Sequence, residues 1–191
     1  TFDSLKGMGW LKKAEQAGDI GVISKFDDIA PQMDSVTRKA FVEDIGKIDS
    51  LPEINGYTAE EAAENLAGLH DVKGVERSAK QIITGGSGFR YEARAAKIFR
   101  KESGIISEVS VKIPGSEIDI LKSNGDIIEC KQGWLANAPG TDGYDKVLGD
   151  LEKKKTAFKN YQKTNGGSKM YVWSDVEPNP DLRSNIEAMG F

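Results

Sequence analysis

Apolar residues recur with helical spacing through the first part of the chain. They predict a helix over 35–48, for which Asp34 is a suitable N-cap. Thr58 opens a capping box that predicts a second helix to about residue 69, and Asp71 is expected to cap a third. This part of the chain shows no strand-like alternation of polar and apolar positions, so we expect it to be helical throughout.

The pattern changes after a glycine-rich stretch at 84–88, which we interpret as a hinge rather than a phosphate-binding loop. We therefore expect a helical N-terminal segment, 1–84, and a second domain, 85–191. The second domain is predicted to be α/β, with an αβββαβ core, a central sheet flanked by helices, and one further helix. These elements are expected over 89–101, 105–113, 117–121, 126–132, 144–163, 170–173 and from residue 181 onward.

The composition of the chain excludes several classes of protein and of site. The chain has 191 residues, of which 38% are hydrophobic and 29% charged, as in a folded globular protein. No apolar run reaches the roughly 18 residues of a transmembrane helix, so we expect no membrane-spanning segment. Cys130 and His70 are single residues of their types, which excludes an internal disulfide, a cysteine zinc cluster and a two-histidine metal motif. Because the chain begins at Thr1, we interpret it as a piece of a longer protein.

Negative charge is concentrated in the N-terminal part. Residues 1–80 carry 10 Lys and Arg against 15 Asp and Glu, a balance of −5, whereas 81–191 carry 16 against 15, a balance of +1. The net charge of −4 therefore does not argue against nucleic-acid binding by the second domain. A bound divalent cation would offset its acids and leave this domain clearly positive.

Charged residues alternate along two neighbouring predicted strands. Alternate residues of a strand share a face, so Glu117 lies beside Asp119 and Glu129 lies beside Lys131. A two-residue turn between the strands would put these pairs on opposite faces. A three-residue loop, Ser123-Asn124-Gly125, instead pairs Asp119 with Glu129 and Glu117 with Lys131. We predict the three-residue loop, because its last position favours glycine and because it keeps the apolar residues together.

Two acids opposite each other need an explanation. Like charges in a cross-strand pair are destabilising, and a divalent cation between Asp119 and Glu129 would remove the conflict. Mg²⁺ suits such carboxylates together with substrate phosphate oxygens, and Mn²⁺ or Zn²⁺ are alternatives. Lys131 could then orient a water molecule or stabilise charge on a phosphate. The alternative is a solvated face with cross-strand charge pairs, in which Glu117 merely holds Lys131.

At this point the residues resemble a known pattern. Asp119, followed after nine residues by Glu129-Cys130-Lys131, resembles the motif of the PD-(D/E)XK nuclease superfamily, although Ile118 stands where that motif has Pro. The stretch 115–121 is similar to the GEIDLI form of the same motif. The resemblance covers about residues 88–176 and implies a restriction-endonuclease-like fold and a metal-dependent endonuclease. It implies catalytic roles for Glu92, Asp119, Glu129 and Lys131, and metal binding by Asp119, Glu129 and Glu117.

Basic side chains of the second domain are candidates for substrate contacts. Phosphate neutralisation by Lys and Arg dominates affinity for nucleic acids. The candidates are Arg90, Arg94, Gln132, Lys146, Lys153, Lys154 and Lys155. The lysine run has an alternative interpretation as a solvated helix face. DNA is the favoured substrate, and RNA, including tRNA, stays open.

Three functional settings follow. The layout resembles the C-terminal toxin regions of bacterial polymorphic and contact-dependent growth-inhibition systems. That resemblance implies release from a larger secreted or cell-surface protein, action in the target cytoplasm and a neutralising immunity protein. A housekeeping restriction, repair or junction-resolving endonuclease is the second setting. The third is a non-catalytic module of the same fold that binds nucleic acid or protein.

Overall fold

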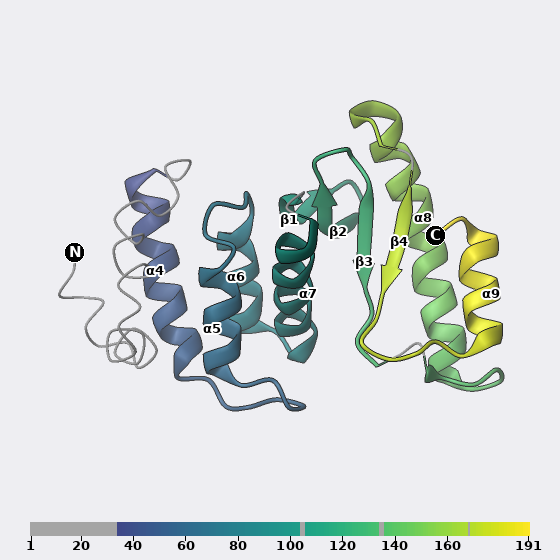
Figure 1. The fold of residues 1–191 in the computed structure, drawn as a ribbon, viewed down its shortest axis with the longest axis horizontal. Coiled ribbons are helices and arrows are strands. Elements are labelled where there is room, and N and C mark those ends of the chain that lie inside the picture. Colours follow the sequence, from purple (N-terminus) through teal and green to yellow (C-terminus); the bar gives the residue numbers. More distant parts are fainter. Residues whose placement is uncertain (1–33, 104–105, 134–135, 168) are drawn as a thin grey trace. The chain divides into compact units, whose positions relative to one another are not determined.

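The computed structural model describes residues 34–103, 106–133, 136–167 and 169–191 (Figure 1). The helical expectation for residues 1–33 lies outside the described residues. The chain forms two compact units, Thr1–Ile98 and Phe99–Phe191, which we describe one at a time. The division falls inside helix α7 (Ser87–Ser103) rather than before it.

Helices form the described part of the N-terminal unit. They are α4 (Ser35–Asp49), α5 (Ala59–Ala67), α6 (Val75–Thr84) and α7 (Ser87–Ser103), the last of which continues into the second unit. Two predicted caps are confirmed, since Asp34 accepts from the backbone N–H of Thr37 and Thr58 from that of Glu61. The cap predicted at Asp71 is wrong. Helix α6 begins after Gly74, whose left-handed φ of +88° turns the chain before the helix starts.

The core of this unit combines apolar helix faces with one buried cation. Phe41, Ile45 and Leu66 are at most 1% exposed. Arg90 is equally buried and donates from Nη1 to the backbone oxygen of Tyr57 at 2.7 Å. A buried guanidinium is expensive to desolvate, so this hydrogen bond ties α7 firmly to the Tyr57 segment.

A four-stranded mixed sheet is the centre of the C-terminal unit (Figure 1). Its strands lie in the order β1-β2-β3-β4; the first three are antiparallel neighbours, and β4 runs parallel to β3. From α7 onward the order of elements is αβββαβα, so the α/β class and the predicted order are confirmed. The elements are β1 (Ile106–Ile113), β2 (Ser116–Lys122), β3 (Ile127–Cys130), α8 (Asp142–Asn165), β4 (Met170–Trp173) and α9 (Pro180–Met189).

The register of the β2–β3 hairpin is the one predicted. Ile120 pairs with Ile128 and Leu121 with Ile127, which leaves a three-residue loop closed by hydrogen bonds between Lys122 and Asp126 and between Lys122 and Gly125. Gly125 has a φ of +83°, the left-handed conformation expected at the end of such a loop. Strand β3 ends at Cys130, two residues earlier than predicted.

Helix α8 packs against the sheet, and α9 packs against α8. Leu121, Ile127 and Met170 form an apolar cluster with Phe158 of α8. Val147 and Leu151 of α8 form a second cluster with residues of α9. In the described part of the chain, no helix has both the length and the apolar character needed to cross a bilayer.

The close approach of the β2–β3 loop to Gly166 can be tested directly. A Cβ on Gly125 would lie 2.7 Å from the backbone oxygen of Gly166, whereas one on Gly115 would meet nothing within 4 Å. Both residues have positive φ, at +83° and +74°. We expect Gly115→Ala to destabilise by about 1–2 kcal/mol through φ alone. Gly125→Ala should lose about 1–3 kcal/mol more through overpacking, as measured by urea unfolding. Equal losses would contradict the close approach of the loop to Gly166.

Candidate active site: a buried acid pair with two lysines

Two carboxylates from neighbouring strands form the centre of the site. Asp119 lies in β2 and Glu129 in β3, and they are 6% and 1% exposed. The β2–β3 ladder pairs residues only up to Ile120 and Ile128. Beyond that point the backbone N–H of Cys130 donates to Asp119 Oδ2 at 2.7 Å. The Asp119 carboxylate thus takes a hydrogen bond that a regular ladder would give to a backbone carbonyl.

Strand β1 is also irregular beside Asp119. Its ladder with β2 pairs Val109 with Ile120 and Val111 with Ile118, and omits the intervening Ser110. Ser110 has a φ of +51°, which is rare for a non-glycine residue, and is buried. The residue that faces Asp119 across this ladder therefore holds a strained conformation, as residues beside functional sites often do.

Two ammonium groups contact the acid pair. Lys131 Nζ lies 2.8 Å from Glu129 Oε1, and Lys154 Nζ of α8 lies 2.5 Å from the same oxygen. Lys154 Nζ is also 3.9 Å from Asp119 Oδ1. Lys131 forms a second ion pair with Asp150 of α8. The site therefore lies between the sheet and α8, and brings three acids together with two lysines.

One oxygen of this cluster lacks a partner. Glu129 Oε1 accepts from both lysines, but Glu129 Oε2 is fully buried and has no hydrogen-bond partner among the described residues. A buried carboxylate oxygen without a donor is destabilising, and such an atom in a folded protein calls for an explanation.

Burial and charge shift the titration of the cluster. Burial, together with the Glu129 carboxylate, raises the pKa of Asp119 from 3.8 to about 8, and attraction to Lys154 offsets this only in part. Burial opposes the charge of Lys131, but Glu129 and Asp150 outweigh it and raise the pKa of this ammonium. Burial likewise opposes the charge of Lys154, and Asp119 and Glu129 outweigh it to raise its pKa. With Asp119 protonated, two carboxylates balance two ammonium groups.

Asp150 is the acid outside the two strands. Burial favours its protonated form, but the hydrogen bond and the charge of Lys131 outweigh this and lower the pKa of Asp150. Asp150 thereby stays charged and holds Lys131 in place.

The predicted set of three metal ligands is assembled only in part. Asp119 and Glu129 come together, whereas Glu117 forms an ion pair with Lys112, its partner on β1. Across the residues that the structure describes, no group of three or more His, Cys, Asp or Glu side chains is arranged to hold a metal ion. Two carboxylates are nevertheless a usual protein contribution to a Mg²⁺ site, and the unpartnered Glu129 Oε2 fits that role.

Three predicted site residues lie in the N-terminal unit. Glu92 is half-buried in α7. Arg94 pairs with Glu61 at 3.4 Å and lies over the ring of Tyr57. Arg90 is buried against the Tyr57 backbone, which leaves it no surface for a phosphate contact in this conformation. The contacts of Arg90 and Arg94 described here are with residues of the same unit.

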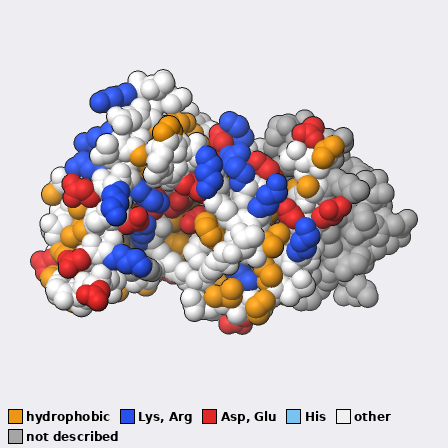
Figure 2. All heavy atoms as spheres, turned by 180° about the vertical axis from the view of Figure 1, so that it is seen from behind, with side chains coloured by type: hydrophobic (Ala, Val, Ile, Leu, Met, Phe, Trp, Pro, Cys, Tyr) orange, Lys and Arg blue, Asp and Glu red, His pale blue; other side chains and the backbone are white. Residues whose placement is uncertain are grey.

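The remaining candidates lie along α8 and after β3. Lys146 and Lys153 are exposed, and Lys155 and Gln132 are half-buried. Figure 2 shows Lys and Arg side chains spread over the surface of the C-terminal unit, with acids among them. Lys154 differs from its neighbours, because it points to the acid pair rather than to solvent.

Sequence reasoning missed Asp150 and the position of Lys154. A signal for Lys154 was present, because Val147, Leu151, Lys154 and Phe158 follow the spacing of one buried helix face. A lysine on such a buried face needs an acidic partner in the interior, because an unpaired buried charge is destabilising. Asp150 stands four residues before Lys154, on the same side of the helix.

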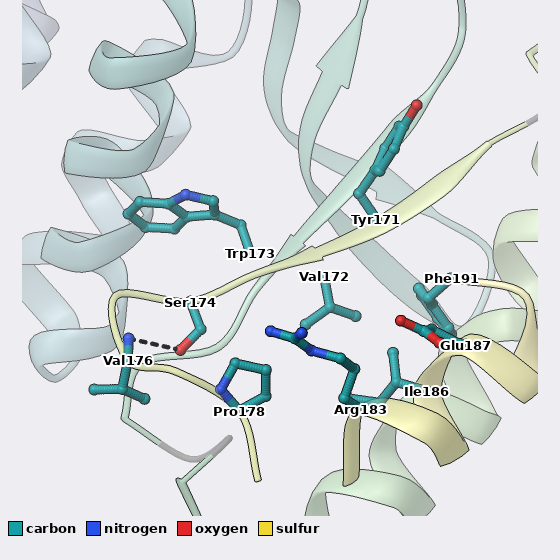
Figure 3. Close-up of a pocket in the computed structure, with 10 residues that line it drawn as sticks. All are labelled: Tyr171, Val172, Trp173, Ser174, Val176, Pro178, Arg183, Ile186, Glu187 and Phe191. Atoms are coloured by element: carbon teal, nitrogen blue, oxygen red, sulfur yellow. Dashed lines mark hydrogen bonds between the residues drawn. The ribbon is translucent and has the colours of Figure 1, made fainter. Parts of the chain in front are cut away.

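A separate hollow lies between β4 and α9 (Figure 3). Its volume is about 340 Å³. Val172 points toward Arg183 of α9, whereas Tyr171 and Trp173 point to the other side of the strand. Since Val172 pairs with Glu129, the hollow is one strand away from the acid pair.

Comparison with protein-family models, curated proteins and solved structures finds no match to this chain.

The raised pKa of Asp119 predicts a pH dependence of stability. Between about pH 4 and pH 8, native Asp119 holds a proton that the unfolded chain has released. The free energy of unfolding therefore falls as pH rises through this range, by at most about 1.4 kcal/mol per pH unit. Urea unfolding of wild-type protein and Asp119→Asn, both with a chelator, checks this. As pH rises, the free energy of unfolding of wild type should fall relative to that of Asp119→Asn. A difference that stays constant with pH would contradict the raised pKa of Asp119.

Proposed function

We propose that the C-terminal unit is a metal-dependent nuclease that hydrolyses phosphodiester bonds of nucleic acid, with DNA as the favoured substrate. The observation that carries the proposal is the buried Glu129 Oε2, which has no partner in the part of the chain that the structure describes and belongs to a carboxylate beside Asp119. A divalent cation would use this oxygen and relieve the repulsion between the acids. Lys131 contacts the same carboxylate, which places a positive charge where it could stabilise a phosphate under attack.

Four residues of the site would have different roles in this reaction. Asp119 and Glu129 would hold a Mg²⁺ or Mn²⁺ ion, with Cys130 N–H fixing the second Asp119 oxygen. When bound, such an ion polarises a phosphate and lowers the pKa of an attacking water. The Lys131 ammonium would stabilise negative charge on the phosphate in the transition state. Asp150 would act as a positioning residue that holds the charged Lys131.

The order of elements supports a finer proposal for the fold. The run α7-β1-β2-β3-α8-β4, with a mixed sheet and the acids on two central strands, is what a restriction-endonuclease-like fold requires. Membership of the PD-(D/E)XK superfamily belongs to the same proposal.

The biological setting that we propose is a toxin. A separate helical unit before the nuclease unit supports it, since an entry or interaction segment would occupy that place. An immunity protein that blocks the acid pair would be its partner, and the cytoplasm of a target cell its place of action. A housekeeping restriction, repair or junction-resolving nuclease is the alternative setting.

One observation favours a second function, a non-catalytic binding module. Both acids already have ammonium neighbours, and with Asp119 protonated the cluster is balanced without any metal. The charges could then serve only to hold α8 on the sheet.

Cleavage assays separate the two functions. Purified protein is incubated with plasmid DNA and with total RNA, in Mg²⁺, in Mn²⁺ and in chelator. We expect metal-dependent cleavage, and a loss of about 10²–10³-fold in Asp119→Asn and in Lys131→Met, which remove a metal ligand and the charge that stabilises the transition state. The substrate that disappears identifies the nucleic acid.

Glu152→Gln is the matched control for these variants. Glu152 is an exposed acid of α8, so its change to an amide should leave the rate within about fivefold. Folded wild-type protein that cleaves neither substrate with either metal would overturn the nuclease and leave the binding module.

A further inference from the structure

Lys154 occupies the place where a cation shared by the two acids belongs. Its ammonium lies 2.5 Å from Glu129 Oε1 and 3.9 Å from Asp119 Oδ1. Glu129 is 1% exposed, and its second oxygen is buried and has no hydrogen-bond partner among the described residues. Two acids on adjacent strands predict a positive charge between them, and the Lys154 ammonium of α8 is one.

The two lysines of the site are held differently. Lys131 has an acid on each side, because it contacts both Glu129 and Asp150. Among the described residues, the ion pairs of Lys154 are with the acid pair alone, and its side chain is 20% exposed, against 15% for Lys131. A flexible side chain with a route to solvent can leave, whereas Lys131 is restrained from two directions.

A divalent cation and the Lys154 ammonium cannot both use the pair in this arrangement. Mg²⁺ binds oxygen atoms at about 2.0–2.1 Å, so an ion shared by both carboxylates would lie against an ammonium that already contacts one of them. Like charges this close repel strongly in a buried site. One of them must move.

We propose that Lys154 is an internal counter-ion of the Asp119–Glu129 pair, and that a divalent metal must displace its ammonium in order to bind. The inference rests on the proposed metal site and adds how that site is regulated. In the metal-free protein Lys154 balances the acids and secures α8. Displacement keeps the site close to neutral, because the incoming ion carries one more positive charge than the departing ammonium and Asp119 releases its proton to solvent as it becomes a metal ligand.

The displacement lowers the apparent metal affinity. A site that is open only a fraction of the time binds with a dissociation constant divided by that fraction. If Lys154 leaves the pair open a tenth of the time, the apparent affinity falls about tenfold. Removing the ammonium should restore that factor.

Titration with Mn²⁺ alone, followed by the electron paramagnetic resonance signal of the free ion, tests the proposal. We expect Lys154→Met and Lys154→Gln to bind Mn²⁺ about tenfold more tightly than wild type. Gln keeps a donor for Glu129 without the charge, and serves if the Met variant does not fold. The double variant Asp119→Asn with Lys154→Gln should lose the gain, which assigns it to this site.

Lys153→Met is the matched control. Lys153 is the exposed neighbour on α8, and its removal takes away the same charge without touching the acid pair. Its Mn²⁺ affinity should stay within about twofold of wild type, because exposed charges are screened. A gain equal to that of the Lys154 variants would contradict displacement.

Thermal unfolding supplies a second readout. In chelator, both Lys154 variants should melt below wild type, because buried acids lose their counter-ion, and added Mn²⁺ should raise their melting temperatures more than that of wild type. If wild type binds Mn²⁺ and both Lys154 variants bind it with the same or weaker affinity, the displacement is overturned but the nuclease proposal stands. Absence of Mn²⁺ binding in all of these proteins overturns the metal site as well.

Discussion

Two carboxylates buried on neighbouring strands are the constraint on which the C-terminal unit depends. Asp119 and Glu129 are almost completely shielded from water, so their charges must be protonated, paired or shared with a cation. In the described structure a backbone N–H and two ammonium groups contact these acids, and the pKa of Asp119 is raised. The position of α8 follows, because Lys154 and the apolar Phe158 must face the sheet together.

This arrangement stabilises the unit less than apolar packing would. A buried ion pair loses much of its attraction to desolvation, and replacing one with apolar residues is often neutral or favourable. Three acids and two lysines gather between α8 and a sheet that elsewhere packs Ile, Leu and Val, and one carboxylate oxygen among them has no partner in the described part of the chain. These features point to a role beyond stability. Strain at Ser110, opposite Asp119, is in keeping with that role.

Local rules predicted the parts of the fold that depend on neighbouring residues. The caps at Asp34 and Thr58 and the three-residue loop ending at Gly125 follow from backbone geometry that a few residues determine. They place Asp119 and Glu129 on adjacent strands without further information. The start of α6 was missed because Gly74, not the better capping residue Asp71, sets the turn. Spacing along α8 places Lys154 on the buried face of the helix. Which groups Lys154 and Asp150 meet depends on how α8 lies on the sheet, and spacing does not determine that.

The central claim is that the Asp119–Glu129 pair is a site for a divalent cation. Anomalous diffraction from crystals grown with Mn²⁺ tests it most directly, because the signal locates the ion without reference to activity. The account predicts a Mn²⁺ peak within bonding distance of both carboxylates, with the Lys154 ammonium moved away from Glu129. Crystals that contain Mn²⁺ elsewhere, or none, with Lys154 still on Glu129, would contradict it.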